Sequence, residues 1–458
     1  MNNTTFRIHT GKPKKIDPQK TIIRRKPRLN LTMTQRFNSP HIGSKKSLNS
    51  SIDLPCVQRT RAGSIVSVHK QQESGYNPIA QVQAIPLTPQ IVLKQFGAYL
   101  SKFEQTEILD YKEIHFLGMK AAKVKATSSD NNFGYDDERN DYKIVPNDHL
   151  AYRYEVQQVI GKGSFGQVCL CFDHKQKETV AVKVIRNQPR FHKQAKIEAK
   201  ILSVLTESSS ENYTVAMLNS FSFRKHICIA FELLGINLYE VLKNNSFRSL
   251  SLKFIRKIAY QLMVCLFHLK AQKIIHCDLK PENVLMSPLK KAGIKVIDFG
   301  SSCFLNEKIH AYIQSRYYRA PEIILGINYR EAIDVWSVGC IVAELFLGFP
   351  IFPGENEMEL LLCIMEVKGV PDSRIIEKSL KKKNFFEGVQ PKVLTNSRGK
   401  KRVPGSRPLG LLMKNCDSDL IDFVDSKGYL ECLEWDCEAR ITPEEALKHL
   451  WLKGEFNL

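Results

Sequence analysis

The 458-residue chain lacks any long apolar run. No stretch approaches the roughly 18 to 20 apolar residues that a membrane-spanning helix requires. The polar start of the chain, rich in Asn and Thr, also lacks the apolar centre of a secretory signal. We therefore expect an intracellular protein without a membrane span, in the cytoplasm, the nucleus or both. The length suggests about two to three domain-sized units.

The chain has 12 cysteines but lacks paired Cys-x-x-Cys motifs. Such pairs are typical of structural zinc sites, and Cys432 and Cys437 have no matching His or Cys pair nearby. Most of the other cysteines lie within apolar segments, where buried free thiols are common. The sequence therefore argues against zinc binding and against a disulfide framework, as expected for a reducing compartment.

Acidic residues are scarce in two segments. Residues 1–80 hold 15 Lys or Arg against 3 acids, and residues 374–407 hold 11 against 2, which accounts for the net charge of +20. One interpretation is a solvated, flexible surface; others are a nuclear-import signal at residues 24–28 or docking to an acidic partner. Aromatic residues are not interleaved with the early basic run, which argues against direct nucleic-acid binding.

The first part of the chain changes character near residue 86. Residues 1–85 show no sustained periodicity and too little apolar surface to offset the entropy of ordering, so we expect a disordered basic tail. Behind Thr88-Pro89, apolar residues at helical spacing from Ile91 to Phe103 predict one amphipathic helix. Residues 131–141 have the composition of a loop.

Short β-type segments alternate with turn residues from residue 154 onwards, which predicts a small antiparallel sheet. The expected strands cover residues 154–160, 167–172, 180–185 and 227–231, and one helix covers residues 189–205. After Ser251 helical periodicity dominates, with later helices at 335–347 and 359–367. The sequence thus predicts an α+β fold, with a cleft between a strand-rich and a helix-rich lobe.

A glycine-rich segment lies between the first two expected strands. Residues 161–166 read Gly-Lys-Gly-Ser-Phe-Gly, a hairpin whose backbone N–H groups can approach phosphate oxygens. A dinucleotide-binding fold would need a helix after these glycines, and here a strand follows. Lys183 is the one lysine of an apolar strand that begins Val-Ala-Val-Lys, and it can reach bound phosphates, while Glu198 on the next helix can pair with it. Taken alone, Lys183 could equally be an edge-strand lysine that faces water.

Three further motifs follow in order. Residues 276–283 read His-Cys-Asp-Leu-Lys-Pro-Glu-Asn, residues 298–300 read Asp-Phe-Gly, and residues 320–322 read Ala-Pro-Glu. Each motif alone is weak, because a single tripeptide often marks only a turn. In this order and at this spacing, chance is a poor explanation.

These motifs supply the groups that phosphoryl transfer needs. Asp278 can accept the proton of an acceptor hydroxyl, and Lys280 can steady the migrating phosphoryl group. Asn283 and Asp298 offer oxygen ligands for Mg²⁺. A catalytically inactive scaffold of the same fold would usually lack one or more of these groups, and all are present here together with Lys183. We therefore favour an active enzyme over a catalytically inactive scaffold.

Residues 154–451 resemble a eukaryotic protein kinase domain, and within that superfamily they resemble the dual-specificity tyrosine-regulated (DYRK) kinases of the CMGC group. The markers are Cys277 in place of the usual Arg of His-Arg-Asp, Ser-Ser-Cys after Asp-Phe-Gly, and residues 312–322 and 352–357. Residues 86–153 resemble the accessory region and homology box of class II members. The resemblance implies a bilobal kinase fold, with the accessory region packed on the β lobe.

The resemblance also implies the remaining boundaries and the ligands. Residues 371–412 would contain the insert of the CMGC group, and residues 452–458 would form a short tail. ATP and Mg²⁺ would bind between the lobes, with Lys183 and Glu198 clamping the phosphates. The expected nucleotide-binding residues are Ile160, Gly161, Lys162, Gly163, Ser164, Phe165, Gly166, Gln167, Val168, Ala181, Phe231, Glu232, Leu233, Leu234 and Leu285.

Activation and substrate choice follow from the same resemblance. The family phosphorylates its own activation loop on the second Tyr of a Tyr-x-Tyr pair, which maps to Tyr312; His310 stands where the first Tyr would be. Arg316 and Arg319 are the candidate partners for the phosphate. The mature enzyme would phosphorylate Ser or Thr of protein substrates near Pro and Arg, and Glu282 and Arg319 would recognise these neighbouring residues. We expect a monomer.

Three structural roles complete the expectations. Glu322 and Arg440 would form a scaffolding ion pair, and Asp334 would support the catalytic loop. Cys277 and Cys303 flank the catalytic site in sequence and could form a reversible disulfide. The alternative is that they are two buried, inert thiols.

Overall fold

The computed structural model describes residues 86–127, 131–208, 212–288, 292–307, 312–392, 395–414, 416–425 and 431–453. All of these belong to one unit of the chain, Gln71–Leu458. The expected tail, residues 1–85, lies outside the described residues, as do His310 and the end of the short tail. Among the described helices, none is long and apolar enough to cross a bilayer.

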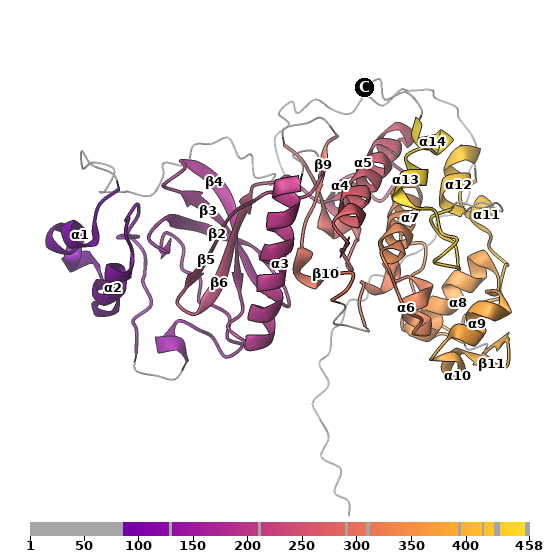
Figure 1. The fold of residues 1–458 in the computed structure, drawn as a ribbon, viewed down its shortest axis with the longest axis horizontal. Coiled ribbons are helices and arrows are strands. Elements are labelled where there is room, and N and C mark those ends of the chain that lie inside the picture. The colour runs from indigo at the N-terminus through magenta and orange to yellow at the C-terminus, as the bar shows by residue number, and fades with distance from the viewer. Residues whose placement is uncertain are drawn as a thin grey trace, which may run out of the picture. The chain divides into compact units, whose positions relative to one another are not determined.

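The strand-rich lobe is built on a six-stranded antiparallel sheet with the order β1-β2-β3-β4-β6-β5 (Figure 1). Its strands are β1 (His149–Leu150), β2 (Tyr154–Lys162), β3 (Gly166–Asp173), β4 (Glu178–Ile185), β5 (Met217–Phe223) and β6 (His226–Glu232). Four of them were predicted, although the two-residue β1 and the partly exposed β5 were not. The antiparallel sheet and the α+β class are thus confirmed.

Helix α3 (Pro189–Ser208) interrupts the sheet and packs against β4, β5 and β6. Its apolar face includes Ile201 and Leu205, which belong to the core of the helical lobe rather than to that of the sheet. The helix therefore contacts both lobes, and its position affects any site between them. Its predicted range was three residues too short at the carboxyl end.

The helix-rich lobe is centred on two long helices that pack against each other, α5 (Leu252–Ala271) and α7 (Ala332–Leu347). Ser251 caps α5, because its side chain accepts a hydrogen bond from the N–H of Phe254. The surrounding helices are α4 (Leu238–Asn244), α6 (Pro321–Leu325), α8 (Glu357–Lys368), α9 (Ser373–Lys378), α10 (Lys382–Phe385), α11 (Leu409–Leu412), α12 (Ser418–Asp425), α13 (Pro443–Ala446) and α14 (Leu450–Lys453).

Short two-stranded hairpins and 3-10 turns connect the helices of this lobe, and some of them carry the motifs of the cleft. The hairpins pair β7 (Ile274–Ile275) with β10 (Cys303–Phe304), β8 (Val284–Met286) with β9 (Ile294–Val296), and β11 (Phe386–Glu387) with β12 (Gln390–Pro391). The turns are η5 (Pro281–Asn283), η6 (Phe299–Ser301) and η7 (Arg316–Tyr318). The two-stranded pairs hold the predicted motifs at residues 276–283 and 298–300 beside each other.

The region before the sheet differs from the prediction of one helix. It forms α1 (Pro89–Phe96), η2 (Gly97–Tyr99), α2 (Lys102–Glu107) and η3 (Ile108–Asp110). The break comes at Ser101, whose side chain and Glu104 form a capping box that starts α2 as a separate helix. The prediction of a single helix was therefore wrong, because apolar spacing alone does not reveal a cap.

Residues 131–141 are more ordered than their composition indicated. They contain η4 (Asn132–Gly134), and both Asn132 and Asp136 are buried. Tyr135 and Tyr142 pack into the core of the sheet together with Val182. This segment is therefore part of the β lobe rather than a solvated loop.

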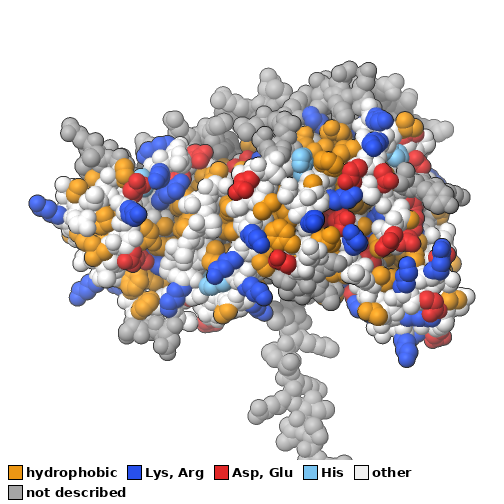
Figure 2. Space-filling model, viewed as in Figure 1, with side chains coloured by type: hydrophobic (Ala, Val, Ile, Leu, Met, Phe, Trp, Pro, Cys, Tyr) orange, Lys and Arg blue, Asp and Glu red, His pale blue; other side chains and the backbone are white. Residues whose placement is uncertain are grey.

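Charge is mixed over much of the surface. On the face shown in Figure 2, Lys and Arg side chains are interspersed with Asp and Glu. Within the basic segment 374–407, Arg402 is buried and pairs with Glu359 and Glu366 of α8 at 3.1 and 2.5 Å. A part of this segment's charge therefore holds it onto the lobe, and does not simply face solvent.

Candidate active site

A cavity of about 660 Å³ lies between the two lobes. Its lining contains most of the residues expected to bind nucleotide, namely Ile160, Gly161, Lys162, Gly163, Phe165, Gly166, Val168, Ala181, Phe231, Glu232, Leu233, Leu234 and Leu285. The other two lie elsewhere. Ser164 is exposed in the hairpin, and the buried Gln167 donates a hydrogen bond to the Tyr142 carbonyl at 2.8 Å.

The glycine-rich hairpin joins β2 to β3. It is closed by the N–H of Gly163, which donates to the carbonyl of Gly166 at 2.9 Å. Gly166 has a φ of 146°, and a Cβ there would come within 2.1 Å of the Val184 carbonyl oxygen, so only glycine fits. Gly163 has open space around its Cα. At Gly163 the hairpin backbone therefore has no side chain and no close neighbour.

Lys183 occupies the centre of a buried ion-pair cluster. Its Nζ lies 2.7 Å from Oε1 of Glu198 and 2.9 Å from Oδ1 of Asp298. Burial would lower the pKa of the Lys183 ammonium, but the charge of Glu198 and then that of Asp298 raise it. The lysine therefore stays charged, held between a carboxylate from α3 and one from the helical lobe.

The sheet explains why Lys183 points into the cavity. In β4 the side chains of Val180, Val182 and Val184 are buried on one face, and Ala181 and Lys183 alternate with them on the other. Glu198 lies on the face of α3 that meets this strand and is buried. The predicted pairing of Lys183 with Glu198 is present in the structure.

Asp278 is not among the residues that line the cavity, but it bonds to Asn283, which is, and its carboxylate has one ammonium and one hydroxyl partner. Its Oδ2 accepts from Lys280 Nζ at 2.6 Å, and its Oδ1 accepts from Ser315 Oγ at 2.7 Å. Lys280 Nζ also donates to Ser315 Oγ at 3.0 Å. Asn283 Nδ2 donates to the Asp278 backbone carbonyl at 2.8 Å and so fixes the loop. A hydroxyl can thus contact both the carboxylate and the ammonium.

Asp334 binds the backbone of the loop that carries Asp278. Its carboxylate accepts from the backbone N–H of His276 at 2.7 Å and of Cys277 at 3.0 Å. Burial raises its pKa to about 7, against the lowering effect of these two bonds. Cys277 has a φ of 66°, a left-handed conformation that is strained for a residue with a Cβ. The two bonds keep the strained turn in place.

The activation segment brings Tyr312 to the surface. Its side chain is 63% exposed, and the Arg319 guanidinium lies 4.0 Å from the centre of its ring. Arg319 is itself buried and contacts Glu357 at 3.2 Å. Arg316 instead donates to the Glu355 carbonyl at 2.6 Å. Of the two expected arginines, Arg319 is therefore the one in contact with Tyr312.

The other predicted pairs are also close. Arg440 forms a bidentate pair with Glu322 at 2.7 and 3.0 Å, and both side chains are buried. The Sγ atoms of Cys277 and Cys303 lie 3.9 Å apart in the interior. Glu282 is exposed at the rim of the cavity.

A profile of the protein kinase domain matches residues 154–452. Dual specificity tyrosine-phosphorylation-regulated kinase 4 of Homo sapiens is 48% identical over 396 residues, which cover 86% of this chain and 75% of that protein. The chain belongs to the DYRK family of protein kinases. Kinase 3 of Homo sapiens is 45% identical over 87% of this chain and 70% of its own length, and kinase 2 of Drosophila melanogaster is 47% identical over 80% and 51%.

This DYRK-family chain is therefore a protein kinase that uses ATP and acts on protein substrates. The family and the bilobal fold inferred from its sequence are confirmed. The most informative residue for the family, Cys277, is also the one whose backbone is strained beside the candidate base.

Several residues of the kinase's site were missed by sequence reasoning. Ser315 contacts Asp278 and Lys280, yet a serine in the activation segment gives no local signal for that contact. Other residues that line the cavity and were not predicted are Val215, Gly235, Ile236, Asn237, Glu240 and Ile297. They include apolar residues, the residues before α4, and Glu240 within α4, and no motif in the sequence marks them.

Proposed function

We propose that this kinase transfers the γ-phosphoryl group of ATP to Ser and Thr of proteins, and that it first phosphorylates its own Tyr312. The observation that carries the proposal is the assembled constellation of Lys183, Glu198 and Asp298 opposite Asp278. A kinase in which the strand lysine and the α3 glutamate are paired has its phosphate clamp in place.

The cavity fits ATP in shape and chemistry. Ile160, Val168 and Ala181 from the β lobe and Leu285 from the helical lobe provide apolar surfaces for a flat base. Open backbone at Gly163 leaves room for phosphates above them. Glu232, Leu233 and Leu234, with Phe231 before them, connect the two lobes along the back of the cavity.

The chain's own groups divide the chemistry. Lys183 binds phosphate oxygens. Asp278 accepts the proton of the substrate hydroxyl while the hydroxyl oxygen bonds to the γ-phosphorus, and the bond from that phosphorus to ADP breaks. Lys280, 2.6 Å from Asp278, stabilises negative charge on the transferred group. Asn283 and the acidic Asp298 fit Mg²⁺, which would neutralise charge on the phosphates when bound. Burial would raise the pKa of Asp298, but Lys183 lowers it, so the carboxylate is ionised.

The assay that tests this function uses purified full-length protein with Mg²⁺-ATP and a Ser/Thr peptide library. Wild type is expected to phosphorylate peptides, whereas Asp278→Asn, of the same size, is expected to lose at least about 10³-fold in kcat because it removes the proton acceptor. An inactive scaffold would show no difference between the two proteins. If both proteins transfer phosphate to the peptides only at the background level, the proposed kinase activity is refuted.

Activation is proposed to follow from phosphate on Tyr312. The exposed hydroxyl is accessible, and Arg319 beneath the ring, with Arg316 nearby in sequence, can pair with the added charge. Mass spectrometry of protein made in bacteria should find phosphate on Tyr312, and none in the Asp278→Asn variant. Unmodified Tyr312 in fully active enzyme would contradict this part alone.

Substrate choice is proposed to involve Glu282 and Arg319. Exposed at the rim of the cavity, Glu282 can pair with an Arg upstream of the target residue. For Arg319, which is buried beside the Tyr312 ring, we propose a role in the preference for a neighbouring Pro. A positional peptide library assayed with wild type and Glu282→Ala tests the first role. An unchanged preference for arginine would exclude it.

We also propose the division into a tail (1–85), an accessory region (86–153), a kinase domain (154–451) with the insert at 371–412, and an end segment (452–458). An intracellular location fits a chain whose described cysteines are all free thiols, and we propose that the protein is a monomer. Tagged protein followed by microscopy would separate nuclear from cytoplasmic location.

A further inference from the structure

A short segment of the accessory region contacts strand β3 and the residues that connect β4 to α3. We name residues 136–142 the strut. Its last two residues bond to the two strands that carry the glycine-rich hairpin and Lys183. The Tyr142 carbonyl accepts from Gln167 of β3 at 2.8 Å. Asp141 binds Arg186, directly after β4, through two bonds of 2.8 Å each.

The strut also holds the connection between β4 and α3. Asn187 donates from its backbone N–H to the Asn140 carbonyl at 2.9 Å and from its side chain to Asp136 at 2.8 Å. Gln188 reaches the Arg139 carbonyl at 3.4 Å. All three residues between the strand and the helix are thus bonded to the strut, and α3 begins immediately after them.

The same contacts extend to the hairpin above the cavity. The backbone N–H of Arg186 donates to the carbonyl of Phe165 at 2.9 Å. The Phe165 ring meets Phe191, in the first turn of α3, edge-on at 5.8 Å, and Lys183 Nζ lies 5.7 Å from its centre. A displacement at Arg186 would therefore reach the hairpin, α3 and Lys183 together.

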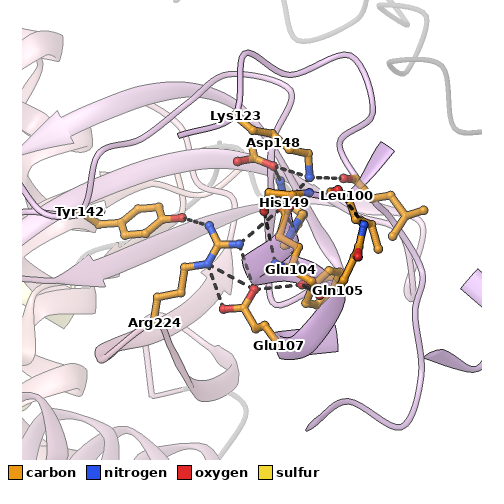
Figure 3. Close-up of polar contacts among 12 residues, drawn as sticks. Leu100, Glu104, Gln105, Glu107, Lys123, Tyr142, Asp148, His149 and Arg224 are labelled. Carbon is orange, nitrogen blue, oxygen red and sulfur yellow. Dashed lines mark hydrogen bonds and ion pairs between the residues drawn. The ribbon is translucent and has the colours of Figure 1, made fainter. Parts of the chain in front are cut away.

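The strut is rigid enough to act as a fixed support. Buried Asp136 accepts from His226 at 2.8 Å and from Asn132 at 2.9 Å. The Tyr142 ring lies in the core of the sheet, and its hydroxyl accepts from Arg224 at 2.9 Å (Figure 3). Arg224 in turn pairs with Glu107 of α2 at 2.9 Å. The strut is thus anchored on both the sheet and the accessory helices.

We propose that the strut positions Glu198 for catalysis, with Asp141 as the positioning residue. The inference rests on the proposed phosphoryl transfer, because it concerns the clamp formed by Glu198 and Lys183. From Pro189 to Glu198 the helix rises about 14 Å at 1.5 Å per residue, so a fixed first turn sets the place of the glutamate. Without the Asp141 bonds, α3 is held at its start by weaker contacts, and Glu198 leaves Lys183 more often.

The chain offers a matched pair for the test. Arg186 binds Asp141 with two bonds and lies 5.6 Å from the Phe191 ring. Arg153 binds Asp173 with two bonds, of 2.9 and 2.6 Å, and lies 4.8 Å from the Tyr154 ring. Both arginines are in the β lobe and are similarly covered, but only the Arg186 pair adjoins α3.

The variants are Arg186→Gln, Asp141→Asn, both together, and Arg153→Gln as the control, all in the full chain. Arg186→Gln and Asp141→Asn are each expected to lower kcat/KM for ATP by about fivefold or more, partly because KM for ATP rises. Fivefold is the lower end of the range for coupling between two sites in a protein. KM for ATP separates a positioning role from a loss of folded protein, because a smaller folded fraction lowers the apparent kcat and leaves KM unchanged. The double variant should resemble the singles, because both remove one contact.

Hydrogen exchange supplies a readout that does not require activity. Amides around Glu198 are expected to exchange faster in Arg186→Gln than in wild type, and not faster in Arg153→Gln at a similar melting temperature. Equal exchange in α3 and equal KM for ATP in these two variants would overturn the positioning role. An inactive wild type would refute the proposed function, yet the exchange comparison would still decide whether the strut holds α3.

Discussion

Cys277 shows how a single residue is fixed by its backbone rather than by its side chain. Its left-handed φ of 66° costs about 1 to 2 kcal/mol for a residue with a Cβ. Two bonds to Asp334 at residues 276 and 277 offset that cost. The turn points the thiol inward, where it donates weakly to the Ile275 carbonyl and faces Cys303. An arginine's charge could not be placed there without a buried partner.

This environment predicts that Cys277 and Cys303 resist oxidation. The hydrogen bond with Cys303 and burial raise the pKa of the Cys277 thiol well above its usual range, so the reactive thiolate is scarce at neutral pH. We expect mild peroxide to leave both cysteines reduced, as read by mass spectrometry after alkylation under denaturing conditions. Cys303→Ser should lose activity in peroxide at the same rate as wild type. A slower loss in the variant would instead support the reversible disulfide.

The buried pair of Glu322 and Arg440 predicts a large stability effect. Glu322→Gln leaves the Arg440 charge in the interior, and removing one partner of a buried pair costs about 3–5 kcal/mol. The control is Glu377→Gln, which breaks a pair with Lys382 in which Glu377 is 61% exposed, and should cost no more than about 1 kcal/mol. Denaturant unfolding of the purified proteins measures both. Similar losses in the two variants would show that the internal pair is not structurally important.

Residues of this kind were predictable from sequence only where a motif marked them. Asp278, Lys183 and Glu198 were found because their chemistry recurs at fixed spacing. Asp141 and Arg186, 45 residues apart, have no such spacing and look like ordinary surface charges. Gln167 was expected in the nucleotide site by its place in the hairpin, yet its side chain turns to Tyr142.

At the scale of elements, long helices were predicted best and short elements worst. Helices α3 and α5 have apolar residues at 3.6-residue spacing over 20 residues, and α7 is a 16-residue, largely apolar segment that is buried on nearly all sides. Strand β5, with the sequence Met-Leu-Asn-Ser-Phe-Ser-Phe, mixes polar residues into both faces and was missed. The break between α1 and α2 depends on a cap, which is a local hydrogen bond and not a pattern of hydrophobicity.

The second of these helices, α2, docks through charge. Glu104 is buried and contacts Lys123 at 2.6 Å, His149 at 3.0 Å and Arg224 at 3.4 Å (Figure 3). With Asp148 and His149 it has the spacing of a metal site. The Lys123 ammonium, 3.5 Å from Asp148, already supplies positive charge there. The cluster is therefore an electrostatic joint between α2 and the sheet.

This joint predicts a dependence of stability on pH. Burial would raise the pKa of the Glu104 carboxyl, but the hydrogen bond to His149 and the charge of Lys123 lower it well below 4.5. A lowered pKa contributes stability above the unfolded value, and that stability is lost as pH falls below it. We expect Glu104→Gln to be less stable than wild type near neutrality, by about 3–5 kcal/mol for a broken buried pair.

The difference between wild type and Glu104→Gln should shrink as pH falls from about 6 to about 3, because the unfolded chain then binds a proton at Glu104 while the folded protein, with its lowered pKa, still holds the carboxylate ionised. Denaturant unfolding of both proteins across this range gives the difference, in which titrating groups that do not contact Glu104 cancel. Glu377→Gln serves as the control, with a small difference at every pH. A gap for Glu104→Gln that stays constant with pH would mean that this carboxylate does not stabilise the fold by its charge.

At the scale of the whole molecule, the accessory region and the kinase domain share their hydrophobic core. Tyr135, Tyr142 and Leu150 are buried with Val156 and Val182 of the sheet. A second cluster, which includes Val92 of α1, Ile114 and Tyr152, lies wholly within the accessory region. The sequence boundary near residue 154 is therefore a boundary of motif similarity, not of folding, because the core crosses it.

This shared core predicts the outcome of truncation. A protein of residues 154–458 exposes core that the accessory region covers, and each fully buried large apolar side chain contributes about 1.5–3 kcal/mol. With several such side chains removed, the loss is comparable to the whole stability of a domain, about 5–15 kcal/mol. We expect residues 154–458 to bind a hydrophobic dye and to lack a cooperative thermal transition, whereas residues 86–458 unfold cooperatively. If the two proteins melt at the same temperature, the kinase domain is stable by itself, and the strut can act on α3 only as a positioning device added to a fold that does not need it.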